Sequence, residues 1–297
     1  MATIATVTTA AVLAAGCTSS SQPPAPPPPS PQPTIAPPSP AALSAVTEAL
    51  EATTTTSATV GFDLSPSQVF GPAQAPIVGT GSFDFVAADG HAQLQQPTGP
   101  EAVVFLPASV FVHQANGPTI LPRGKSWVSA GLTETALATN FPQFVIQAEA
   151  LNPVFLLQQA VWGAVAAAPL GPSTVDGRAT QGYLVTVDLS RVTTAASGPA
   201  AAAFVRATGY QLNALSTTTP AGSTTDQVRV WVDDAGRVVR YQASPPGAGA
   251  GTISVTLGSF GTPVRVSPPS RKVVADIASL SPGGERENAG GGDSDGA

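Results

Sequence analysis

The chain has few charged residues, few aromatic residues and a single cysteine. Charged side chains make up 10% of its 297 residues and aromatic side chains 6%, and there are only two histidines. One cysteine cannot form an intrachain disulfide, and two isolated histidines without a second cysteine cannot complete a zinc cage. Stability must therefore come from a hydrophobic core, for which a hydrophobic content of 42% is ample.

Basic residues are absent from the first part of the chain. No lysine or arginine precedes Arg123, whereas six of the 18 acidic residues lie before it, so the net charge of −6 comes from this part. The sequence has no basic patch for nucleic acid and no polybasic run for electrostatic attachment to a membrane. We therefore predict no nucleic-acid partner and no electrostatic membrane binding.

The motifs that carry catalysis are also missing. Neither His91 nor His113 lies in a nucleophile elbow, and residues 258–261, Gly-Ser-Phe-Gly, have the wrong spacing for one. Residues 124–126, Gly-Lys-Ser, end like a phosphate-binding loop, but Thr119 stands where its first glycine should be. We predict that the protein is not an enzyme and needs no cofactor.

Cys17 closes the run Leu13-Ala14-Ala15-Gly16-Cys17, directly behind an apolar segment over residues 2–15. Small residues before a cysteine are typical of a bacterial lipobox, at which a signal peptidase cleaves and the thiol receives a diacylglycerol. The apolar segment is too short to span a bilayer as a stable helix. We predict a signal peptide over 1–16 and a lipidated Cys17, which places the protein on the extracytoplasmic face of the cell membrane. The alternative is a buried free cysteine in a protein without an anchor.

Composition divides the remainder into three parts. Residues 17–40 are rich in serine and proline, with four consecutive prolines at 26–29, and we predict an extended tether there. Residues 41–280 are expected to form one domain. Residues 281–297 contain mainly glycine and acidic side chains, and we predict a disordered tail.

The first half of the domain predicts one helix followed by strands. Ser39-Pro40 and the apolar residues that follow favour an amphipathic helix. Alternating apolar residues predict strands at 58–64, 79–85, 92–94, on both sides of Pro107 within 102–113, and at 124–128.

The second half predicts two more helical regions and further strands. Residues 141–168 are expected to form two helices that meet at Asn152-Pro153, and residues 199–215 another helix. Strands are expected at 183–189, 228–232, 239–243 and 252–260, with a turn at Asp233-Asp234-Ala235-Gly236. Together these elements predict an α+β fold with a large, curved antiparallel sheet.

Several segments, taken in order, resemble the actinobacterial lipoproteins of the LppX/LprG type. They are the lipobox, the tether, Gly79-Thr80-Gly81-Ser82-Phe83-Asp84-Phe85, Gly124-Lys125-Ser126-Trp127, Asn152-Pro153, Val175-Asp176-Gly177, Tyr183-Leu184-Val185-Thr186-Val187-Asp188, Val230-Trp231-Val232-Asp233-Asp234-Ala235-Gly236-Arg237 and Phe260-Gly261-Thr262-Pro263-Val264. The resemblance covers residues 40–277. It implies a LolA-like half-barrel, closed by helices around an apolar cavity, that carries the acyl chains of a lipid or glycolipid across the cell envelope.

The family has no catalytic residues to transfer, so Cys17 alone is carried over by motif. The cavity-lining residues are inferred from strand parity, which places alternate side chains on one face of the sheet. They are Val60, Phe62, Leu64, Phe83, Phe85, Leu156, Val185, Val187 and Val230. We expect a monomer that binds a lipid or glycolipid; the alternative is an anchored structural or regulatory module with a filled core and no ligand.

Overall fold

The structure is a computed structural model that describes residues 35–65, 76–96, 99–107, 109–113, 121–131, 152–195, 225–244 and 251–280. Cys17, the tether up to residue 34, the tail and the helices expected over 141–151 and 199–215 lie outside these ranges. Within the described residues, no helix has the length and apolar character that crossing a bilayer requires.

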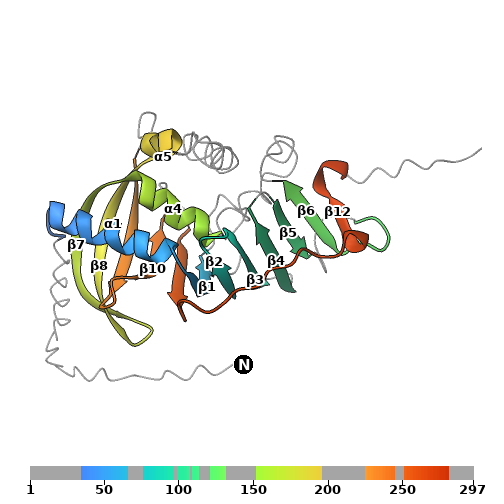
Figure 1. Ribbon diagram of the computed structural model, residues 1–297, viewed down its shortest axis with the longest axis horizontal. Coiled ribbons are helices and arrows are strands. Elements are labelled where there is room, and N and C mark those ends of the chain that lie inside the picture. The colour runs from blue at the N-terminus through green and yellow to red at the C-terminus, as the bar shows by residue number, and fades with distance from the viewer. Residues whose placement is uncertain are drawn as a thin grey trace, which may run out of the picture. The chain divides into compact units, whose positions relative to one another are not determined.

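The described residues form an open, curved sheet of twelve strands and a few helices, which confirms the predicted α+β half-barrel class (Figure 1). The order across the sheet is β12-β6-β5-β4-β3-β2-β1-β11-β10-β9-β8-β7. All neighbouring strands are antiparallel except β12 and β6. The strands are β1 (Ser57–Leu64), β2 (Ile77–Asp84), β3 (Asp89–Gln96), β4 (Gly99–Leu106), β5 (Ser109–His113), β6 (Trp127–Gly131), β7 (Ala164–Val175), β8 (Arg178–Asp188), β9 (Thr225–Asp233), β10 (Val238–Ala243), β11 (Ile253–Gly258) and β12 (Val274–Asp276).

The helices are α1 (Pro40–Thr54), α4 (Pro153–Gly163) and α5 (Leu189–Ala195), with short 3-10 helices η3 (Arg271–Val273) and η4 (Ile277–Ser279). Helix α1 begins as predicted, because the Ser39 hydroxyl accepts a hydrogen bond from the Ala42 N–H at 3.2 Å and Pro40 occupies the first turn. Asn152 caps α4 in the same way, accepting from the Val154 N–H at 3.1 Å, with Pro153 in its first turn.

One part of the predicted secondary structure is wrong. Residues 164–168 were expected to continue a helix, but Ala164–Val175 forms β7, an edge strand paired with β8. The run Ala-Val-Ala-Ala-Ala has a high intrinsic helix propensity, and pairing with β8 overrides it. Pro169 and Pro172 lie in this strand, and proline is tolerated at a sheet edge because its missing N–H faces no partner strand.

Glycines allow β2 and β3 to approach each other closely. A Cβ atom added to Gly79 or Gly81 would clash with the backbone carbonyl oxygens of Gln93 and His91 on β3. A Cβ added to Gly90 would overlap the ring of Phe83, which packs over this glycine. Substitution at any of these three positions would therefore push β2 and β3 apart.

Thr53 joins the end of α1 to the sheet. It is completely buried, and its hydroxyl donates to the Ala49 carbonyl at 2.7 Å while accepting from the Val238 N–H at 2.8 Å. The ladder between β9 and β10 shifts register between Val238 and Arg240, so the threonine supplies a partner for a backbone N–H at this irregularity.

We expect Thr53→Val to lower the free energy of unfolding by about 1–3 kcal/mol, because it leaves the buried Val238 N–H without a partner while keeping the side-chain shape. Chemical denaturation measures this change. Thr54→Val is the matched control, since the Thr54 hydroxyl bonds only to carbonyls of its own helix. Equal effects of the two substitutions would contradict the role assigned to Thr53.

Candidate functional site

The candidate site is the apolar face of the sheet, here called the inner face. The hydrogen-bonding register places residues of neighbouring strands side by side. One row of such residues on the inner face crosses eight strands. The row consists of Ala275, Val128, Val112, Val103, Ala92, Gly81, Val60 and Leu257. A second row continues to the other edge through Phe62, Val255, Tyr241, Val230, Tyr183 and Pro169. Apolar side chains therefore follow one another along these two rows from one edge of the sheet to the other.

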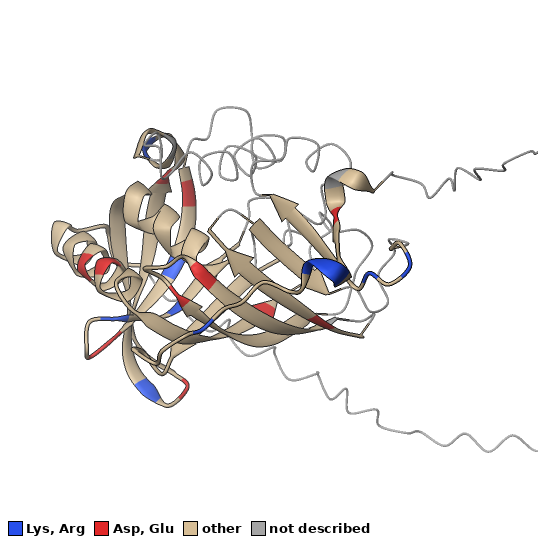
Figure 2. Cartoon of the chain, turned by 45° about the vertical axis from the view of Figure 1, so that its right-hand side comes forward, with Lys and Arg blue, Asp and Glu red and all other residues tan. Residues whose placement is uncertain are grey.

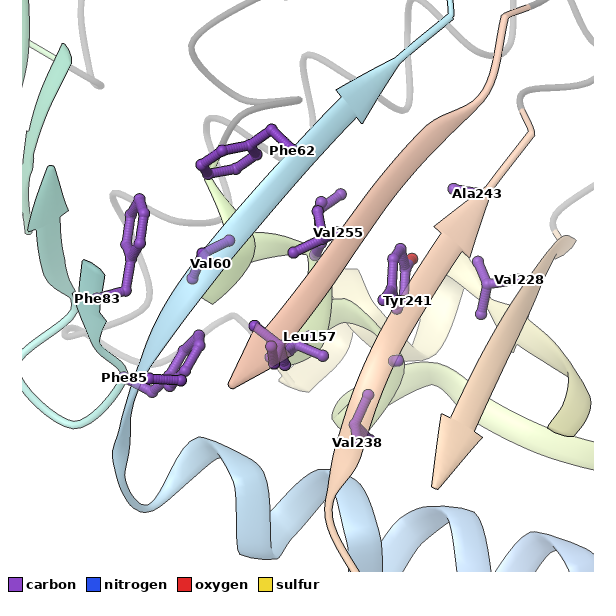
Figure 3. Packing of buried hydrophobic residues seen from close by; sticks show 14 of the residues in the cluster. Val60, Phe62, Phe83, Phe85, Leu157, Val228, Val238, Tyr241, Ala243 and Val255 are labelled. Carbon is purple, nitrogen blue, oxygen red and sulfur yellow. The ribbon is translucent and has the colours of Figure 1, made fainter. Parts of the chain in front are cut away.

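The structure brings the nine residues predicted from parity into one hydrophobic cluster. At most 8% of the surface of each residue is exposed to solvent. Seven lie on the inner face itself, Phe85 lies in the turn directly after β2, and Leu156 lies on α4. Figure 3 shows Val60, Phe62, Phe83, Val255 and Tyr241 together in this cluster. Cys17 lies outside the described residues.

Helix α4 packs on the inner face, as its last residue shows. A Cβ added to Gly163 would lie 2.6 Å from the Val187 side chain and 2.7 Å from that of Val192. The main contacts of α1 and α4 are with each other and with β7, β8, β9 and β10. In the described part of the chain, these helices therefore cover mainly the half of the inner face formed by β7–β10.

Three aromatic rings lie in the other half of the inner face. Phe83 packs edge-on against Phe62, with 6.1 Å between ring centroids, and in a tilted arrangement against Phe105 at 5.4 Å. Such geometries are favourable for aromatic pairs beyond the area that they bury. These rings link β1, β2 and β4 on the inner face of the sheet.

Asp226 and Tyr241 are polar residues of the inner face that were not predicted as site residues. Asp226 lies opposite Val187 in the ladder, and burial raises the pKa of its carboxyl group. This carboxylate accepts a hydrogen bond from the Gln227 N–H at 2.7 Å. Tyr241 is 2% exposed, and burial together with the nearby Asp226 charge raises the pKa of its hydroxyl. The alternation Asp226, Val228, Val230 already places this carboxyl on the apolar face and was the signal available in the sequence.

The outer face carries polar and mixed contacts instead. Trp231 lies opposite Gly182 on this face, as parity predicts, and the Arg240 guanidinium lies 5.4 Å from its ring. His113 packs edge-on against Trp127 at 5.1 Å. Among the residues that the structure describes, no three histidine, cysteine or acidic side chains are placed to hold a metal ion.

The chain is similar in fold to solved structures of lipoproteins. It matches LprF from Mycobacterium bovis with a TM-score of 0.43 and 15% identity over 79% of this chain and 99% of that one. LppX from Mycobacterium tuberculosis matches with a TM-score of 0.44 and 15% identity over 77% and 99%. A LolA superfamily protein from Nitrosomonas europaea matches with a TM-score of 0.27 and 8% identity over 76% and 94%.

LprF and LppX are mycobacterial lipoproteins, and LppX gives its name to the type that the sequence motifs resemble. No family model matches the chain, and no curated protein matches it by sequence.

Proposed function

We propose that the protein is a membrane-anchored, extracytoplasmic lipoprotein that binds the acyl chains of an envelope lipid or glycolipid on its inner face and carries that lipid across the envelope. The observation that carries the proposal is the continuous apolar character of the inner face across the whole open sheet. Lipidation of Cys17 is part of the proposal, because it would keep the carrier in the envelope.

The inner face provides apolar surface against which an acyl chain can be buried. Burial of apolar surface contributes about 25 cal/mol per Å², or about 0.8 kcal/mol per methylene, before the costs of binding are subtracted. A long chain laid along several strands would therefore be retained without specific polar contacts. Asp226 and Tyr241 are the polar groups available to a hydroxyl of such a lipid beneath the helices.

The burial of the nine predicted residues also suits the alternative, an anchored module whose core is filled by its own side chains. The two functions differ in one measurable respect. A carrier purified from its native membrane brings lipid with it, whereas a filled module does not. Native mass spectrometry of the purified protein makes this distinction.

We expect Ala92→Phe to reduce the bound lipid several-fold while leaving the melting temperature close to that of the parent. Ala92 lies on the inner face between Gly81 and Val103, so a phenyl ring there would occupy the space proposed for an acyl chain. Gln93→Phe adds the same ring to the outer face of the same strand and should leave lipid binding unchanged.

In a filled core the added ring at position 92 would instead force strained rotamers and backbone shifts costing about 1–3 kcal/mol. A strongly destabilised Ala92→Phe variant, together with a parent that carries no lipid, would overturn the carrier function and leave the filled module.

A further inference from the structure

Two short basic segments, distant in sequence, meet at one corner of the sheet. Arg123 and Lys125 directly precede β6, and Arg271 and Lys272 form η3 directly before β12. Strands β6 and β12 are the parallel pair of the sheet, with Val274 opposite Trp127. Because parallel strands begin at the same end, both segments are placed together there. We call these four residues the basic corner.

Hydrogen bonds fix the two segments to each other. The Ser126 N–H donates to the Val273 carbonyl at 2.9 Å, and the Lys125 ammonium donates to the Arg271 carbonyl at 3.2 Å, across 146 residues of sequence. The Lys125 N–H closes a turn on the Pro122 carbonyl at 3.0 Å. Gly124 lies in this turn with a φ of +82°, and nothing surrounds the position that its Cβ would occupy. The two segments are thus fixed to each other, and the space beside Gly124 is open.

The charges of the basic corner are available to an external partner. Arg123, Arg271 and Lys272 are exposed and Lys125 is half-buried. The ion pair between Arg237 and Asp233 involves none of the four residues of the corner. Figure 2 shows the two basic segments near each other at the β12 end of the sheet.

The fold therefore builds a polybasic cluster in a chain of net charge −6. The sequence has no polybasic run, and the four residues come together only because β6 and β12 pair. The cluster contains a third of the twelve basic residues of the protein.

We propose that the basic corner docks the domain onto a membrane surface through anionic lipid headgroups. Each lysine or arginine near an anionic surface contributes about fivefold to binding, and this attraction requires exposed cations rather than a shaped pocket. The position of the corner suits such docking. The residues leading into α1 bond to the opposite edge strand, through the Ser39 N–H and the Ala167 carbonyl at 3.0 Å.

The basic corner and the N-terminal end of the described domain are thus at opposite edges of the same sheet. Eleven strand spacings of about 4.8 Å separate these edges along the sheet. A domain tethered at one edge and docked at the other would have two separate attachments to membrane. This inference goes beyond the proposed function, because it concerns an edge of the sheet and not the inner face.

The test is sedimentation with vesicles of phosphatidylglycerol mixed with phosphatidylcholine, using the full chain with Cys17→Ser so that no lipid anchor contributes. We expect binding to these vesicles at low salt, release at high salt, and no binding to phosphatidylcholine alone. The double variant Arg271→Gln/Lys272→Gln should bind about 25-fold more weakly, since two contributions of about fivefold are lost.

The matched control is Arg191→Gln/Arg229→Gln, which removes two exposed cations from α5 and β9 and changes the net charge equally. Retained binding by this control, with unchanged melting temperatures for both variants, would support the basic corner. Equal losses for both variants, or no binding by the parent chain, would overturn it.

The acidic tail is the other candidate occupant, since residues 281–297 contain Glu285, Glu287, Asp293 and Asp295. A chain truncated after Leu280 tests this directly. Vesicle binding that arises only in the truncated chain would assign the basic corner to the tail and overturn docking to the membrane. Lipid content measured on the same variants reports separately on the inner face.

Discussion

Phe83→Ala is expected to lower the free energy of unfolding by about 3–5 kcal/mol, measured by chemical denaturation. The Phe83 side chain is completely buried and contacts the rings of Phe62 and Phe105. The Phe83 ring also packs over Gly90 and occupies the space that a side chain at position 90 would need. Its removal would leave a cavity on the inner face, where the flanking glycines offer no side chain to fill it.

Phe111→Ala is the matched control for this substitution. Phe111 lies on β5 and is half-buried on the outer face, opposite Ser129. Its loss should cost less than half as much, because less apolar surface returns to water. Equal losses of unfolding free energy at the two positions would show that the aromatic contacts of the inner face do not stabilise the sheet.

The alternation of apolar residues predicted the inner face of β8 correctly. Val185 and Val187 share a face with Tyr183 in the sequence pattern, and the register of β8 with β9 places all three on the inner face. The turn at residues 233–236 also forms as predicted, because Gly236 adopts a φ of +71° and the Asp233 side chain accepts from the Ala235 N–H. Parity and turn chemistry are local properties, so the sequence reveals them.

The order of the strands is not local, and the sequence could not provide it. Strand β12 has three residues and no alternating pattern, and it pairs with β6 only because the chain crosses from β11 to the other edge of the sheet. The basic corner depends on this pairing. A patch built from two separate segments becomes visible only when the tertiary structure is known.

The error at β7 has a similar origin. Its alanines at 164 and 166–168 favour a helix when only neighbours in sequence are considered. The backbone groups of this segment find partners in β8 instead, over ten residue pairs from Ala164 to Val175. The predicted helix therefore ends at Gly163, where close contact with Val187 and Val192 leaves no room for a side chain.

Cys17→Ser is expected to move nearly all of the protein from the membrane fraction to the soluble fraction. Diacylglycerol on the thiol together with an N-terminal acyl chain gives stable anchoring, whereas one chain alone gives marginal binding. Because the basic corner is proposed to bind anionic headgroups, the membranes are washed at high salt before fractionation. Salt screens the charges of Arg271 and its neighbours but leaves a covalent anchor in place.

Ser19→Ala is the control, since it changes the segment after the lipobox and keeps the cysteine. It should remain with the membrane after the same wash. The melting temperature of Cys17→Ser should equal that of the parent, because the described fold begins well after this residue and Cys17 is not needed for its contacts. Undiminished pelleting of Cys17→Ser after the high-salt wash would contradict lipidation. Release by salt of the parent chain would contradict it equally, because only electrostatic attachment is reversed in that way.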